Sequence, residues 1–159
     1  MEATDYIKRM HEISLKKLTL VEEILTITQK QKEALGSGKL DAMDALIDER
    51  QLKMDAVDKI DEQFIVYASR LKSLLSLKSF EDLPKHHLPG TNELKDCVSK
   101  IHQRLEEIKS LEDENTALLK IELKDTQGKI DHSKTFKRVQ GAYHPVSSNI
   151  PSYFFDKKK

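Results

Sequence analysis

Residues 31–57 read QKEALGSGKLDAMDALIDERQLKMDAV, in which a charged amphipathic helix runs into Gly36-Ser37-Gly38 and a second helix of similar character begins. Gly36 can take the left-handed conformation that ends a helix, and Asp41 can accept backbone N–H groups near the start of the next. No strand-like run lies on either side. The stretch therefore predicts two antiparallel helices, whose ridges and grooves favour the binding of another helix over catalysis.

The chain of 159 residues is rich in charge and poor in helix breakers, with 34% charged residues, five Gly and four Pro. This composition is typical of long helices exposed to solvent. A hydrophobic content of 38% is low for a compact core, which favours a bundle with a narrow apolar seam. A single cysteine excludes an intramolecular disulfide. The absence of a signal-peptide pattern and of an apolar run near 18 residues predicts a soluble, cytoplasmic protein.

The spacing of apolar residues predicts one helical domain over residues 1–138. It consists of a helical hairpin over residues 4–75, a linker with prolines and a glycine over residues 76–91, and a third helix over residues 92–138. Residues 139–159 form an irregular basic and aromatic tail. The predicted fold is all-α: an elongated antiparallel bundle of three long helices with coiled-coil-like seams.

Polar residues interrupt two of the predicted seams. In the second helix, Arg50 and Asp61 occupy heptad positions, and we expect each to snorkel or to lie at the rim. In the third helix, Asn115 lies between Leu111 and Leu118 in the seam. An Asn at such a position either is buried and fixes the register or turns to solvent. After it the helix becomes apolar on more than one side, which indicates an additional partner.

Charge is unevenly distributed, although the formal net charge is zero. Residues 41–62 hold eight acidic and three basic residues, and the acids complement the positive end of the helix dipole. Residues 129–159 hold seven basic and two acidic residues, typical of a solvated extension or of an arm for an acidic partner. Tyr153, Phe154 and Phe155 are consecutive, which indicates that the tail packs on its own helices or on a partner.

No motif for enzymatic chemistry is present: there is no Gly-rich phosphate loop, no paired-cysteine metal spacing and no nucleophile elbow. His86 and His87 are expected to be solvated, and Cys97 to be a structural thiol. The sequence therefore predicts neither an enzyme nor a metal or other cofactor. A pI of about 7.0 and the lack of a base-reading motif argue against nucleic-acid binding. Interleaved acids in the third helix argue against stable membrane insertion.

Three parts of the chain resemble the FlgN family of flagellar export chaperones, and the resemblance covers nearly the whole length. LGSGKLDAMDALIDERQLKMDAV (35–57) is similar to the family's leucine, turn, glycine and acidic helix start. LEDENTALLKIEL (111–123) resembles its C-terminal helix, in which an Asn precedes a leucine pair by three residues. GAYH (141–144) and SYFFDKKK (152–159) resemble its aromatic, lysine-ended tails.

The resemblance implies a chaperone that binds the C-terminal helices of hook-filament junction proteins, keeps them unassembled and delivers them to the gate of the type III export apparatus. The residues expected to hold the client are apolar and lie in the third helix: Leu118, Leu119, Ile121, Leu123, Phe136 and Val139. Packing of these residues on the first two helices is the alternative. The family's tail tyrosine, implicated at the export gate, maps to Tyr143 or to Tyr153.

Two other functions fit the sequence pattern. One is a filament-cap export chaperone, which follows the same logic with a different client. The other is a coiled-coil scaffold without a client, in which the heptad seams pair between copies of the chain, for example in a homodimer.

Overall fold

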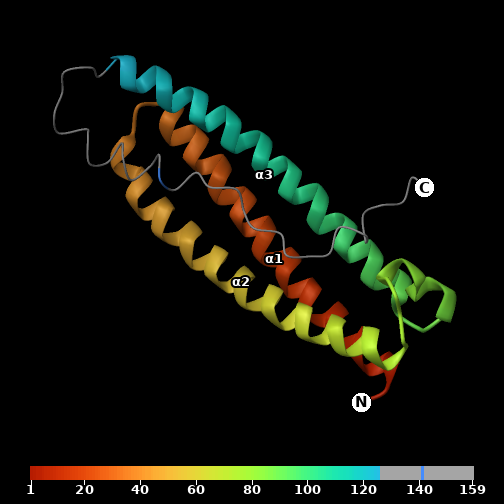
Figure 1. The fold of residues 1–159 in the computed structure, drawn as a ribbon. Coiled ribbons are helices and arrows are strands. Elements are labelled where there is room, and N and C mark those ends of the chain that lie inside the picture. Colours follow the sequence, from red (N-terminus) through yellow and green to blue (C-terminus); the bar gives the residue numbers. More distant parts are fainter. Residues whose placement is uncertain (126–140, 142–159) are drawn as a thin grey trace. The chain divides into compact units, whose positions relative to one another are not determined.

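The computed structural model describes residues 1–125 and 141 of the chain, and over residues 1–125 every element is helical. In chain order the elements are α1 (Ala3–Gly36), the 3-10 helix η1 (Leu40–Ala42), α2 (Met43–Leu74), the 3-10 helix η2 (Phe80–His86) and α3 (Thr91–Asp125) (Figure 1). The predicted all-α fold with three long helices is confirmed. The expected continuation of the third helix to residue 138 lies outside the described residues.

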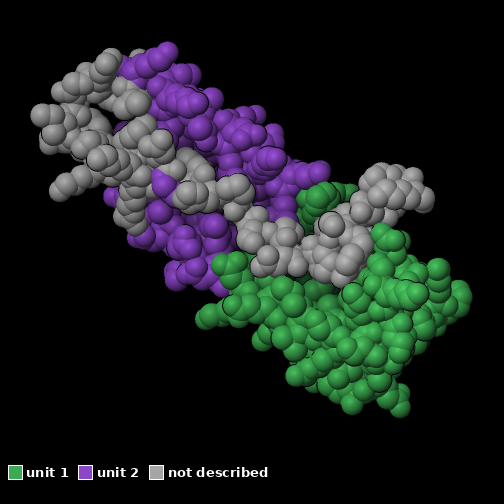
Figure 2. All heavy atoms as spheres, in the orientation of Figure 1, with its two compact units in different colours: residues 1–21, 56–103, 147–159 green, residues 22–55, 104–146 purple. Residues whose placement is uncertain are grey.

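Contacts divide the chain into two compact units, each of which contains a part of all three long helices (Figure 2). Among the described residues, unit 1 comprises residues 1–21 and 56–103. Unit 2 comprises residues 22–55, 104–125 and 141. Both units therefore depend on segments that are far apart in the sequence.

Within each unit, α1 and α2 run antiparallel. In unit 1, the ring centroids of Tyr6 on α1 and Tyr67 on α2 lie 6.2 Å apart. Lys17, further along α1, pairs with Asp61, which comes earlier on α2.

The same direction holds in unit 2. Glu23 of α1 pairs with Lys53 of α2, and Thr28, further along α1, accepts a hydrogen bond from Arg50, which comes earlier on α2. The antiparallel direction expected of the hairpin is thus present in both units.

The buried side chains follow steps of three and four along each helix, as a heptad seam requires, with one step of seven on α2 and one on α3 where the residue between is only partly buried. On α1 the buried seam is Ile7, Met10, Ser14, Lys17, Val21, Ile24, Thr28, Gln31 and Leu35. On α2 it is Met43, Ile47, Arg50, Val57, Asp61, Phe64, Ala68 and Leu71. On α3 it is Leu94, Val98, Ile101, Ile108, Glu112, Asn115 and Leu119. Polar side chains therefore lie inside all three seams.

The α1–α2 turn ends α1 with paired backbone hydrogen bonds. The N–H of Lys39 donates to the carbonyl of Ala34 (2.8 Å), and the N–H of Gly38 donates to the carbonyl of Leu35 (3.3 Å). Gly38 has φ of +70° and is the left-handed residue of this motif. The prediction that Gly36 takes the left-handed conformation is therefore wrong, because Gly36 is the last residue of the helix and the reversal occurs two residues later.

The end of α2 repeats this geometry without a glycine. Ser76 has φ of +53°, and the N–H of Leu77 donates to the carbonyl of Lys72 (2.9 Å). The segment predicted as a linker then forms η2, which buries Phe80 and Leu83 in unit 1. The connection from α2 to α3 is thus packed by its own apolar side chains.

Candidate partner-binding site

The end of α3 contains the described part of the predicted client surface. Leu119 is only 3% exposed and lies in an apolar cluster, the turn cluster. Leu118 is partly buried against the same cluster, whereas Ile121 is 57% exposed. The turn cluster consists of Ala34, Leu35, Leu40, Met43, Ile47 and Leu119. One predicted residue is thus inside unit 2, one is at its edge and one is at the surface.

The other residues predicted to bind partners fall where side chains are not described. Leu123 belongs to α3, but only its helical backbone is described. The remaining ones lie outside the described residues: Phe136, Val139, Tyr143, Tyr153, Phe154 and Phe155.

The α3 seam in unit 2 differs from the predicted one. After Ile108 the buried positions are Glu112, Asn115 and Leu119, whereas Leu111 and Leu118 are only partly buried. The prediction placed Leu111 and Leu118 in the seam because they are apolar. The alternating steps of four and three residues from the start of α3 lead instead to Glu112. The seam therefore contains an acid that the sequence analysis placed outside it.

Five polar side chains from all three helices form a buried layer in unit 2, here called the unit 2 layer: Thr28, Gln31, Arg50, Glu112 and Asn115. Arg50 forms an ion pair with Glu112, and its Nε donates to Thr28 Oγ1 (3.3 Å). Asn115 Nδ2 donates to the backbone carbonyl of Thr28 (3.2 Å). The layer therefore connects α1 to both other helices.

Two amides of the unit 2 layer are incompletely bonded. Both Nε2 and Oε1 of Gln31 are buried without a hydrogen-bond partner among the described residues, and so is Oδ1 of Asn115. Both side chains are fully buried. An unbonded polar group removed from water costs about 1–3 kcal/mol, so part of the layer opposes the packing of α3 on α1.

Ion pairs at the surface of unit 2 flank this layer. Lys32 Nζ lies 2.7 Å from Glu114 Oε2, and Arg104 Nε lies 3.7 Å from Glu22 Oε2; both pairs join α1 to α3. Their side chains are 39% to 51% exposed. Exposed pairs of this kind contribute about 0–1 kcal/mol each, so they orient α3 more than they hold it.

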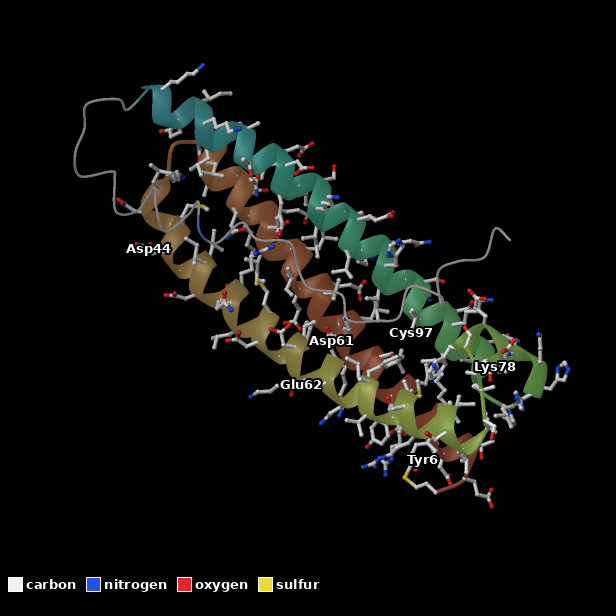
Figure 3. The ribbon with its side chains drawn as sticks, viewed as in Figure 1. Tyr6, Asp44, Asp61, Glu62, Lys78 and Cys97 are labelled. Atoms are coloured by element: carbon white, nitrogen blue, oxygen red, sulfur yellow. The ribbon has the colours of Figure 1, made fainter. Side chains whose placement is uncertain are left out.

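Unit 1 has a buried ion pair of its own, between Lys17 Nζ and Asp61 Oδ1 (2.5 Å). Figure 3 shows Asp61 on the side of α2 that faces α1, whereas the neighbouring Glu62 points away. Burial lowers the pKa of Lys17 below its ordinary value, while the negative charge of Asp61 opposes that shift. The pair is thus a charged contact inside an otherwise largely apolar seam.

The expectation for Arg50 and Asp61 is wrong, because both are at most 2% exposed and neither snorkels to the rim. Each instead binds an opposite charge on another helix. The expectation that left Asn115 either buried or solvated resolves to the buried form. Sequence reasoning missed Lys17 and Glu112. Both lie at seam positions and carry charges opposite to those of Asp61 and Arg50, and this combination could have identified them.

The described residues offer little catalytic chemistry. They contain no group of three or more His, Cys, Asp or Glu side chains placed to hold a metal ion. Burial raises the pKa of the Cys97 thiol, with Lys100 opposing, so the reactive thiolate is disfavoured. Among residues 1–125, no helix is long and apolar enough to cross a membrane.

Comparison with known proteins gives one match. The model of the FlgN protein family matches residues 1–145, which is most of the chain. No curated protein and no solved structure matches it. The family match includes all three long helices and therefore both the unit 2 layer and the ion pair of unit 1. The chain belongs to the FlgN family of flagellar export chaperones.

Proposed function

We propose that this protein is a cytoplasmic chaperone that binds the C-terminal helices of hook-filament junction proteins, prevents their premature assembly and delivers them to the flagellar type III export apparatus. Membership of the FlgN family supports flagellar export chaperoning in general. Long charged helices with apolar seams suit this task, because an amphipathic helix binds by laying its apolar face into a groove.

The exposed side chain of Ile121 carries the proposal for the binding surface. It lies two residues beyond the buried Leu119 and close in sequence to the partly buried Leu118. A large apolar side chain in water next to a packed core is a place where an added helix gains buried area. We therefore assign the first client contact to this end of α3 in unit 2.

The rest of the binding surface is proposed from the family resemblance. Leu119 contributes once α3 moves, and Leu123, Phe136 and Val139 extend the surface along the chain. Tyr143 contacts the export gate, with Tyr153 as the alternative.

Phe154 and Phe155 join Tyr153 in contacting a partner. This assignment rests on three consecutive aromatic side chains at the end of a highly charged chain.

Titration calorimetry of the full chain against C-terminal peptides of the junction and filament-cap subunits of the same organism tests the function. We expect the junction peptides to bind and Ile121→Asp to weaken that binding by about tenfold or more, since a charge replaces a buried apolar contact. Leu52→Asp is the matched control, because Leu52 is 70% exposed on α2 of the same unit and lies outside the proposed surface. Its affinity should equal that of the unmodified chain.

Three other results would contradict parts of the proposal. Binding of the cap peptide alone would make the protein a filament-cap chaperone. Equal loss of affinity in both aspartate variants would remove the proposed surface. Binding of neither peptide, together with a stable dimer in sedimentation equilibrium, would favour the coiled-coil scaffold.

A further inference from the structure

The two halves of α3 contribute different side chains to their units. In unit 1, the fully buried seam residues of α3 are Leu94, Val98 and Ile101, all apolar. In unit 2, two of the buried seam residues are Glu112 and Asn115. The second half of α3, from Arg104 to Asp125, therefore packs through a seam that is partly polar.

Release of this second half returns polar groups to water. Glu112 and Asn115 regain hydration, and the buried amide of Gln31 gains the partners that it lacks in the described structure. The apolar loss is confined largely to Ile108 and Leu119, since Leu105, Leu111 and Leu118 are already partly exposed. The first half of α3 has less such compensation, because its buried side chains are apolar apart from Thr91, whose hydroxyl donates to the carbonyl of Leu88 (2.9 Å).

The α1–α2 part of unit 2 keeps its own contacts when α3 leaves. Five of the six residues of the turn cluster belong to the α1–α2 turn and the ends of its two helices. Lys53 Nζ also lies 2.7 Å from Glu23 Oε2, which pairs α2 with α1. The surface that α3 would leave behind lies between α1 and α2 and includes the guanidinium of Arg50, which contacts Thr28 of α1 and Glu112 of α3.

We propose that residues 104–125 of α3 detach from unit 2 and that a client helix takes their place on α1 and α2, with a client carboxylate bound to Arg50. Charge complementarity selects the occupant, because the guanidinium of Arg50 is paired with Glu112 when α3 is packed in place (the closed form) and needs another carboxylate when α3 has left. The matching helix has an acid in its apolar seam, with apolar residues four positions before and seven positions after it, as Ile108 and Leu119 flank Glu112. The nature of the client rests on the proposed function; the detachment does not.

Detachment also explains how Leu119 can serve the client. In the closed form this side chain is inside the turn cluster and no partner reaches it. Once residues 104–125 leave, the side chain of Leu119 becomes exposed, as that of Ile121 already is, and the same segment can cover the outer side of the client. One movement therefore opens the groove and exposes apolar side chains on both sides of this part of α3.

Hydrogen exchange of the full chain without any client tests the detachment. We expect the amides of residues 105–122 to exchange at least about tenfold faster than those of residues 94–101, because local opening is cheaper where polar groups are released. Equal protection of the two halves would overturn the proposal. This result is independent of whether the protein binds flagellar peptides.

Cross-linking tests the exchange of helices. Lys32→Cys with Glu114→Cys ties α3 to α1 when the two thiols are joined by a bismaleimide with a reducible centre. Glu23→Cys with Lys53→Cys ties α2 to α1 in the same way and is the matched control. The two sites are 2.7 Å ion pairs of the same unit. We expect the first cross-link to weaken binding of the junction peptide at least about tenfold and reduction to restore it, while the control cross-link changes nothing. Full affinity in the first cross-linked form would overturn the exchange.

A peptide of residues 104–125 tests the carboxylate. Added in excess, it should compete with the junction peptide for the full chain, and its Glu112→Gln version should compete at least about fivefold less well, because Arg50 then loses its charged partner. Equal competition by both peptides would overturn the assigned role of Arg50. Failure of the unmodified chain to bind any junction peptide would remove the proposed client, but the exchange rates would still decide the detachment.

Discussion

The buried polar groups of unit 1 and unit 2 differ in which helices they join. In unit 1, one lysine and one aspartate form a short ion pair between α1 and α2. In unit 2, Arg50 and Glu112 belong to a layer of five side chains, and the amide of Gln31 in that layer has no partner among the described residues. The ion pair of unit 1 joins α1 to α2 and does not involve α3. The layer of unit 2 includes side chains of α3, so the packing of α3 there buries polar groups at a cost in free energy.

This difference assigns different roles to the two units. The ion pair of unit 1 and the layer of unit 2 each fix the register of their helices, because a slip by one heptad would place a charge against an apolar side chain. Buried polar atoms without a hydrogen-bond partner among the described residues occur in both units, Ser14 Oγ in unit 1 and the Gln31 amide and Asn115 Oδ1 in unit 2. Of these three residues only Asn115 lies on α3, so release of α3 recovers free energy in unit 2. We therefore expect unit 1 to hold the three helices together and unit 2 to open for a partner.

The largest effect is expected when the unit 1 ion pair loses one member. Asp61→Ala should lower the free energy of unfolding by about 3–5 kcal/mol, since it leaves the buried ammonium of Lys17 without its carboxylate. Urea denaturation followed by circular dichroism measures this change. Glu62→Ala, at the exposed neighbouring position, is the control and should change the free energy by less than about 0.5 kcal/mol.

A double variant separates loss of charge pairing from loss of packing. Lys17→Met with Asp61→Leu should recover most of the stability, because apolar residues of similar size replace a buried ion pair at little cost. If the double variant is as unstable as Asp61→Ala, the ion pair is not the source of the effect, and the two units differ less than we infer.

A smaller effect, about 2–4 kcal/mol, is expected for Leu119→Ala in unit 2. The substitution leaves a cavity in the turn cluster, whereas Leu118→Ala at the partly buried neighbour should cost about 1 kcal/mol. Thermal unfolding of both variants checks the order. A larger loss at residue 118 would mean that α3 follows the register predicted from sequence, and the contrast between the two units would have to be redrawn.

Sequence patterns were sufficient to predict the three helices, because breakers are few and the period of apolar residues is regular over each helix. The register of α3 beyond Ile108 was not predicted, because a search for apolar residues passes over a buried acid. The burial of Arg50 and Asp61 also depends on partners located 62 and 44 residues away along the chain. Such partners can be predicted from the sequence only by pairing residues of opposite charge that occupy seam positions on different helices.

The candidate site was predictable to a smaller extent. An excess of apolar residues after Asn115 correctly indicated that α3 has apolar side chains on more than one side, since Leu119 is buried and Ile121 is exposed. The sequence did not distinguish the buried from the exposed member, because both are apolar and lie about 200° apart, on nearly opposite sides of the helix, and either side could face the hairpin. Contacts with the α1–α2 turn decide between them.

The smallest expected effect compares the turns that end α1 and α2. Gly38→Ala should destabilise unit 2 by about 1 kcal/mol, because φ of +70° is unfavourable for any residue with a Cβ. Space is not the cause, since an added Cβ would lie 3.7 Å from Glu122 Oε1, an ordinary contact. Gly36→Ala is the control: Gly36 is helical, an added Cβ meets nothing within 4 Å, and the variant should be more stable by about 0.5 kcal/mol.

The corresponding position in unit 1 is Ser76, which already accepts φ of +53° with a side chain present. Ser76→Gly should therefore raise the stability of unit 1, by less than about 1 kcal/mol, because relief of strain is partly offset by the entropy of an unfolded glycine. Differential scanning calorimetry of these three variants measures both turns on one scale. Opposite signs for the stability changes of Gly38→Ala and Ser76→Gly would show that both chain turns need the left-handed conformation. No change in stability for Gly38→Ala would show instead that the α1–α2 turn relaxes to another geometry. The turn cluster would then not keep α1 and α2 in place after α3 detaches.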